Sequence, residues 1–139
     1  MQVTRQADYA LRAMLYLARL GPNQRAATSK IAESQEIPLS FLAKIISQLS
    51  IARLVNTSRG AKGGVTLSRA PEEISLLDVV EAIDGPITLS ECSGDPSICA
   101  FGNTCPIHEI WCDAQAEIVH KLSQATFDIL LAREKALSK

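Results

Sequence analysis

The amino-acid sequence predicts a mainly α-helical fold: a winged helix-turn-helix with a two-stranded β-wing, followed by a long helix. Apolar residues recur at helical spacing, and aromatic residues make up only 4% of the chain, which suits helices better than a β-sandwich. Residues 28–52 read as two helices joined by a short turn, and residues 54–68 as two strands joined by a glycine-rich turn. We therefore divide the 139 residues into a winged helix-turn-helix at 1–70 and a second region at 71–139.

The first helices carry recognisable start and stop signals. Thr4 can cap an amphipathic helix that ends at the breaker Gly-Pro-Asn of residues 21–23. Thr28 can cap a short helix, residues 36–38 make a turn, and a further helix runs from Ser40 to Ala52. Its apolar back includes Phe41, and its opposite face carries small and polar side chains, as expected of a helix that enters the major groove. That face consists of Ser40, Ala43, Lys44, Ser47 and Gln48. Taken alone, the segment is equally consistent with an ordinary surface helix.

A basic hairpin directly after this helix favours the winged-helix interpretation. Residues 54–58 and 65–68 alternate as strands do, and the turn between them contains Arg59, Gly60 and Lys62. Glycines at the tip permit positive φ and a close approach of the backbone to DNA. A nucleotide phosphate loop is the rival interpretation, but it would lie between a strand and a helix rather than between two strands.

The second region predicts a capped helix, a loop and a long helix. Ser75 can cap a helix that ends near Gly85, residues 87–104 read as a loop, and Pro106 suits the first turn of a long helix. A final helix is expected at residues 127–137. The apolar stripe of the long helix exceeds what so small a chain can cover, so we expect it to be a dimerisation helix that pairs with a second copy in a homodimer. The alternative is burial of the stripe within one chain.

The net charge of −1 hides an asymmetry between the two regions. Residues 1–70 hold ten Lys/Arg and three Asp/Glu (10 − 3 = +7), whereas residues 71–139 hold four and twelve (4 − 12 = −8). A basic region beside an acidic one indicates that one face meets a polyanion, unless the split arose by chance. There is no signal-peptide pattern and no apolar run near the roughly 20 residues of a membrane span. We therefore expect a cytoplasmic protein with no membrane partner.

Four cysteines lie close together, in the spacing Cys92-x6-Cys99-x5-Cys105-x2-His108, with Cys112 one turn further on. Clustered cysteines in a cytosolic chain indicate metal or redox chemistry more often than disulfides. Soft thiolates suit iron–sulfur clusters, zinc and copper(I), but structural zinc sites usually have tight Cys-x2–4-Cys pairs, which are missing here.

Three cysteines leave a fourth ligand position open. His108 is the nearest candidate, since it lies one helical step after Cys105. Asp8 is distant in sequence but could come from a second subunit, and Cys112 is a weaker candidate. An oxygen or imidazole ligand binds iron more labilely than a thiolate does, which would leave an opening for a small reactive molecule.

These features together resemble the IscR/NsrR family of iron–sulfur transcription regulators, over nearly the whole chain. The resemblance rests on Asp8-Tyr9-Ala10 after Thr4, on Ile37-Pro38-Leu39-Ser40-Phe41-Leu42, on Arg59-Gly60-x-x-Gly63-Gly64-Val65-x-Leu67, and on the three cysteines with Cys105-Pro106-Ile107-His108-Glu109-Ile110-Trp111. It implies a homodimer that binds double-stranded operator DNA. The family's base-reading positions would fall on Pro38, Ser40, Phe41, Ala43 and Lys44, with Arg59 in the minor groove beside Gly60 and Lys62.

The resemblance also implies a cluster held by Cys92, Cys99 and Cys105, with a fourth ligand that differs between branches. The IscR branch uses the position of His108 and a 2Fe–2S cluster, whereas the NsrR branch uses the position of Asp8 from the other subunit and a nitric-oxide-sensitive 4Fe–4S cluster. The His-x-x-Trp stretch slightly favours 2Fe–2S. Cys112 matches neither branch, and some members have an acidic residue where this chain has Ala43.

The sequence therefore predicts a transcription regulator, not an enzyme, whose operator affinity is controlled by an iron–sulfur cluster that senses iron, redox or nitric oxide status. One alternative is a cluster-free regulator that depends on thiols or zinc. A thiol redox enzyme is less favoured, because the chain has no Cys-x-x-Cys and no nucleophile in a catalytic arrangement.

Overall fold

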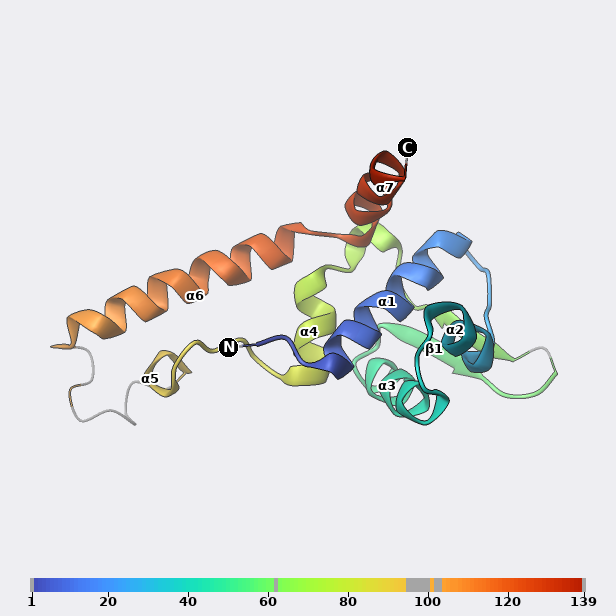
Figure 1. Ribbon diagram of the computed structural model, residues 1–139, viewed down its shortest axis with the longest axis horizontal. Coiled ribbons are helices and arrows are strands. Elements are labelled where there is room, and N and C mark those ends of the chain that lie inside the picture. The colour runs from blue at the N-terminus through green and yellow to red at the C-terminus, as the bar shows by residue number, and fades with distance from the viewer. Residues whose placement is uncertain (1, 62, 95–100, 102–103, 139) are drawn as a thin grey trace.

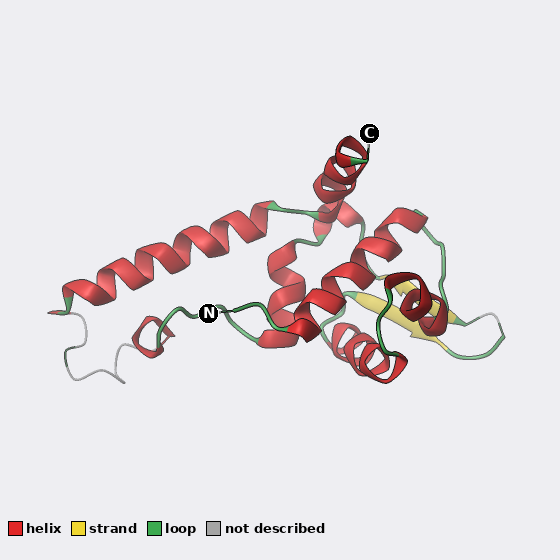
Figure 2. Cartoon of the chain, in the orientation of Figure 1, coloured by secondary structure: helices red, strands yellow, loops and turns green. Residues whose placement is uncertain are grey.

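The computed structural model describes residues 2–61, 63–94, 101 and 104–138, with Cys92 and Gly94 described by their backbone alone. Its mainly helical winged helix-turn-helix confirms the predicted fold class (Figures 1 and 2). In chain order the elements are α1 (Arg5–Leu20), α2 (Thr28–Gln35), α3 (Leu39–Ile51), β1 (Val55–Ser58), β2 (Gly64–Leu67), the 3₁₀ helix η1 (Pro71–Glu73), α4 (Leu76–Asp84), α5 (Glu91–Gly94), α6 (Pro106–Gln124) and α7 (Phe127–Leu137).

Helix α1 runs through the middle of the molecule and supplies much of the core (Figure 1). The Thr4 hydroxyl accepts from the backbone N–H of Ala7 at 3.1 Å, which confirms the predicted cap. The same hydroxyl donates to Asp84 Oδ1 at 2.6 Å and so ties the start of α1 to the end of α4. The helix ends at Gly21, whose φ of 91° suits the residue without a Cβ.

The helix-turn-helix differs from the sequence prediction at its first cap. Ala27 rather than Thr28 precedes α2, and Thr28 is the first helical residue without a side-chain cap. Glu36 ends α2 in the left-handed conformation with a φ of 54°, and this reverses the chain. Buried Ile37 then anchors the turn by donating its N–H to the carbonyl of Ala32 at 2.9 Å. The turn is thus held by one apolar side chain and the terminal carbonyls of α2.

The wing is an antiparallel hairpin whose register pairs Val55 with Leu67 and Ser58 with Gly64. Two hydrogen bonds join the segment before α2 to the hairpin: the Val65 N–H donates to the carbonyl of Ala26 at 2.8 Å, and the Ala26 N–H donates to that of Val65 at 3.1 Å. Val55 and Val65 are buried against the helices. The root of the wing is therefore part of the core, while its tip extends beyond it (Figure 1).

The second region contributes to the same hydrophobic core as α1–α3. Ser75 caps α4 as predicted, and Phe127, 1% exposed, brings the start of α7 into the core beside Ile74 and Val79. The prediction of a loop over residues 87–104 is wrong at Glu91–Gly94, where α5 forms. The short helix η1 was not predicted either. In both cases the sequence offered no periodicity, because a helix of one turn is too short to show one.

Helix α6 extends away from the body of the molecule, and none of its residues is buried (Figures 1 and 2). Pro106 occupies its first turn as predicted, where the missing N–H costs no hydrogen bond. At its C-terminal end, next to the body, α6 leads to α7 past an antiparallel bridge between Ser75 and Thr126 (Figure 1). In the described part of the chain, no helix is long and apolar enough to cross a membrane.

The capping box of α4 generates a stability prediction. The Ser75 hydroxyl accepts from the Asp78 N–H at 3.2 Å, and Asp78 Oδ2 accepts from the Ser75 N–H at 2.9 Å. We expect Ser75→Ala to lower the free energy of unfolding by about 1 kcal/mol in urea denaturation at fixed protein concentration. The control Ser29→Ala, at an exposed position of α2, should change it by less than about 0.5 kcal/mol. Equal unfolding midpoints for the two variants would contradict the cap.

Candidate nucleic-acid interface and cysteine site

Helix α3 presents four of the five predicted small and polar side chains to solvent. Its back is buried through Leu42, Ile45, Ile46 and Leu49. On the opposite side lies an exposed face made of Ser40, Ala43, Lys44 and Ser47, which we call the recognition face. Pro38, at the N-cap of α3, is exposed beside it. A helix with this division can enter the major groove without uncovering its core.

Two residues at the edge of α3 differ from the prediction. Phe41, expected on the apolar back, is 48% exposed, because it lies roughly a quarter of a turn from the middle of the buried stripe. Gln48, expected on the polar face, is half-buried, and its Oε1 is closed to solvent and has no hydrogen-bond partner among the described residues. The sequence reasoning also missed Leu39, which is 53% exposed at the start of the helix. Phe41 is thus accessible to a partner, and Gln48 is less accessible than expected.

The tip of the wing needs glycine for two different reasons. Gly60 has a φ of 100°, and its carbonyl accepts from the Gly63 N–H at 2.9 Å to close the turn. At Gly63 a Cβ would lie 2.3 Å from the Ser58 carbonyl oxygen, so no side chain fits there. Arg59 is exposed at this tip, while Lys62 lies outside the described residues. The turn therefore presents a cation and bare backbone together.

Two of the predicted cysteine ligands belong to segments that meet where α5 packs on α6. Cys92 belongs to α5, which packs on α6, and Cys105 is the half-buried N-cap residue of α6. The Leu89 N–H donates to Gln115 Oε1 at 3.2 Å and holds the approach to α5 against α6. Cys99 lies outside the described residues. Cys92 and Cys105 thus lie on neighbouring elements, and thiolates are the ligands by which proteins hold iron–sulfur clusters.

His108 and Asp8, the two stronger of the three candidates for the fourth ligand, have other partners in the described structure. His108 lies on α6 with its Nε2 3.4 Å from the Sγ of Cys112. Asp8 lies in the first turn of α1 with its Oδ2 3.4 Å from the Nε of Arg12, and the Arg12 Nη1 donates to the Gln35 carbonyl at 2.9 Å. Among the described side chains, no three or more His, Cys, Asp or Glu residues gather in a group that could hold a metal ion. The i, i+4 spacing of His108 and Cys112 was the sequence signal for their contact.

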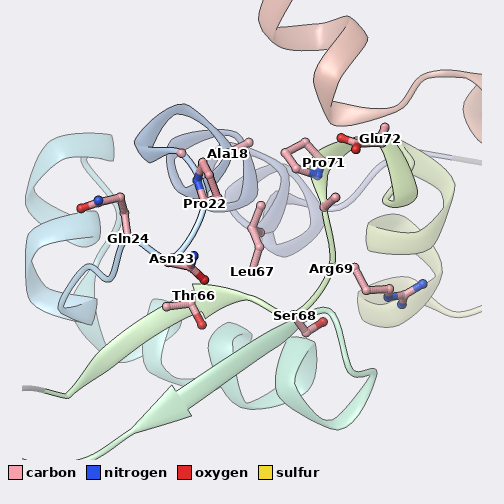
Figure 3. Close-up of a pocket in the computed structure, with 12 residues that line it drawn as sticks. Ala18, Pro22, Asn23, Gln24, Thr66, Leu67, Ser68, Arg69, Pro71 and Glu72 are labelled. Atoms are coloured by element: carbon pink, nitrogen blue, oxygen red, sulfur yellow. The ribbon is translucent and has the colours of Figure 1, made fainter.

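A separate cavity of about 490 Å³ is lined by the end of α1 and the residues after it, by β2, and by the start of η1 (Figure 3). Figure 3 shows Asn23 and Thr66 on one side and Arg69 and Glu72 toward the other. None of the residues that the sequence predicts for DNA or cluster binding lines it. The cavity therefore does not belong to either predicted site.

Comparison with known proteins agrees with this architecture. The Rrf2 family model, described as an iron-dependent transcriptional regulator, matches residues 3–133. The regulator NsrR of Shouchella clausii is 30% identical over 138 residues, covering 99% of this chain and 93% of that protein. The solved structure of CymR, the global cysteine regulator of B. subtilis, has a TM-score of 0.81 at 24% identity, covering 96% of this chain and 98% of that one. T. potens IscR has a TM-score of 0.80 at 23% identity, covering 100% and 92%.

The exposure of Phe41 beside buried Leu42 generates a matched prediction. Phe41→Ala removes a side chain that is 48% exposed, so we expect weaker binding to DNA selected by this protein from a random pool, with little change in stability. Leu42→Ala removes a side chain that is 0% exposed, and should lower the free energy of unfolding by about 2–5 kcal/mol. Fluorescence anisotropy and urea denaturation measure the two effects. Unchanged DNA affinity for Phe41→Ala would contradict its place in the interface.

Proposed function

Because this chain belongs to the Rrf2 family of transcriptional regulators, we propose that it binds double-stranded operator DNA as a homodimer, under the control of an iron–sulfur cluster. The observation that carries the proposal is the exposed recognition face of α3 together with a wing tip that carries Arg59 and whose turn is shaped by Gly60 and Gly63. The helix would read base edges in the major groove, and Arg59 would enter the adjacent minor groove. In this role the protein would act in the cytoplasm.

The charge distribution supports the same orientation on DNA. Lys30 on α2, Lys44 on α3 and Arg59 at the wing are all exposed. Residues 1–70 carry a net charge of +7, from ten Lys/Arg and three Asp/Glu (10 − 3). Phosphate contacts from such cations supply affinity and position the protein, while the recognition face supplies discrimination. The acidic second region would be repelled from the phosphates and would therefore point away from the DNA.

The cluster would be held by Cys92, Cys99 and Cys105. When bound, it supplies a centre that responds to redox state or to small reactive molecules. His108 supports the 2Fe–2S form as fourth ligand, since it follows Cys105 by three residues on the same helix. Asp8 supports the 4Fe–4S form, in line with the NsrR relative, and would have to leave Arg12. Because relatives are named as transcriptional regulators, we propose no catalytic role for these residues.

The exposed apolar surface of α6 supports the homodimer. Ile107 is 61% exposed, Ile110 63% and Trp111 42%. Contiguous large apolar side chains on a protein surface usually mark an interface. A second α6 packed against them would bury this surface. It would also place two recognition faces on one DNA duplex, at half-sites about one helical turn or a multiple of it apart.

A charge placed in this surface tests the homodimer. We expect Ile110→Glu to shift the protein from dimer to monomer at micromolar concentration in light scattering coupled to size exclusion, because burying an unpaired carboxylate is unfavourable. The matched control is Ile129→Glu on α7, where the isoleucine is 54% exposed, and it should stay dimeric. A monomeric native protein, or an unchanged dimer in Ile110→Glu, would refute the α6 interface.

Anaerobic purification with iron and sulfide analysis tests the cluster. We expect a coloured protein with about two or four irons per chain and matching sulfide, and a different operator affinity after removal of the cluster. Loss of the native absorption in His108→Ala but not Asp8→Ala would select the 2Fe–2S form, and the reverse would select 4Fe–4S. His120→Ala, at an exposed position of α6, is the control.

Two outcomes would overturn cluster control. One is equal operator affinity for the protein with and without its cluster. The other is a colourless, iron-free protein even after reconstitution, which would leave the DNA interface in place and point to a thiol- or zinc-dependent regulator. The fold shared with CymR, named as a cysteine regulator, is compatible with that second outcome.

A further inference from the structure

The contact between His108 and Cys112 brings together two of the candidates for the fourth cluster ligand. The Sγ of Cys112 lies 3.4 Å from His108 Nε2 and 3.9 Å from Nδ1. The two residues are four positions apart on α6, so they share one face of the helix. Both are half-buried on a helix that contributes nothing to the core. We call them the thiol–imidazole pair.

The separation of the two donor atoms matches an edge of a zinc coordination tetrahedron. Zinc lies about 2.3 Å from a thiolate sulfur and about 2.0–2.1 Å from an imidazole nitrogen, and a tetrahedral angle then places those donors about 3.6 Å apart. The Sγ–Nε2 distance of 3.4 Å is close to this value. Because Sγ also lies only 3.9 Å from Nδ1, the sulfur is beside the ring rather than in line with the Nε2 lone pair, so the imidazole must turn for both atoms to bind one ion.

The donor types select the class of ion. A thiolate and an imidazole favour zinc and other borderline or soft cations, whereas magnesium and calcium favour oxygen ligands. The described side chains provide no group of three or more metal-binding residues, so a two-ligand site would leave coordination positions to water. Such a site holds an exchangeable ion, unlike the closed four-ligand sites that stabilise folds.

We propose that His108 and Cys112 form a bidentate site for Zn²⁺, or a similar borderline divalent cation, on the exposed helix α6. This site is separate from the set Cys92, Cys99 and Cys105. Its occupation has a consequence that rests on the proposed function: His108 is a candidate cluster ligand, and a bound zinc ion would withdraw it from the cluster.

The test isolates the pair in the full-length chain. In the triple variant Cys92→Ser, Cys99→Ser, Cys105→Ser, the one remaining thiol is that of Cys112. Anaerobic titration with Co²⁺, a spectroscopic substitute for zinc, should produce a thiolate-to-cobalt charge-transfer band that saturates near one ion per chain. Added Zn²⁺ should abolish the band by displacing the cobalt.

Further substitutions in this background assign the ligands. Adding Cys112→Ala should remove the band, and adding His108→Ala should weaken cobalt binding by about tenfold or more, whereas adding His120→Ala should leave it unchanged. Circular dichroism checks that each variant keeps its helices. Absence of the band from the triple variant, or equal affinity with and without His108, would refute the site.

Cluster reconstitution tests the consequence for His108 separately. Preloading the cluster-free wild-type protein with Zn²⁺ should slow reconstitution more than it does in Cys112→Ala. Equal rates in the two proteins would show that zinc does not withdraw His108. If no cluster forms under any condition, the proposed function fails, whereas the cobalt titration still decides whether the metal site exists.

Discussion

The close packing of α1 against its neighbours is the constraint on which the rest of the structure depends. Ala7, Ala10 and Ala13 on this helix are 0% exposed, and such small side chains allow other elements to approach its backbone closely. Helices α2, α3, α4 and α7 and strand β2 all contact α1. The tilt of α3, and hence the direction of its recognition face, is set by this contact together with the buried back of α3. The wing is positioned by the same core through Val55 and Val65.

Asp8 illustrates how one residue can combine a structural contact with a candidate sensor role. Its carboxylate pairs with Arg12, and Arg12 also donates to the terminal carbonyl of α2 at Gln35. The Asp8 side chain is 61% exposed, and an exposed ion pair contributes no more than about 1 kcal/mol. Release of Asp8 would leave Arg12 Nη1 bonded to the Gln35 carbonyl, but it would take the facing carboxylate away from Arg12 Nε, which is closed to solvent in the described structure. A ligand role for Asp8 would therefore require Arg12 to rearrange.

In residues 71–139, helices α4 and α7 contribute side chains to the core, whereas α6 does not. Phe127 and Val79 lie in the same core as α1, whereas α6 between them in sequence has no buried residue. Its contacts with α4 and α5 and the bridge at Thr126 connect it to the body. A change at the cysteine site would thus reach the DNA-facing part through few elements, and α4, which packs on both α1 and α6, is the shortest of these connections.

Local signals in the sequence determined the elements, their caps and the inventory of donor side chains. Thr4 and Ser75 cap helices as predicted, because capping depends on residues three positions away. The predicted cap at Thr28 is wrong because a residue suited to capping can also be the first residue of a helix. Helix α5 was not predicted because a single turn shows no periodicity. Only the tertiary structure decided how far Phe41 is exposed, that Arg12 reaches the Gln35 carbonyl, and that α6 lies outside the core. Side-chain accessibility and contacts depend on which elements pack together, and that packing balances burial over the whole chain rather than within any one segment.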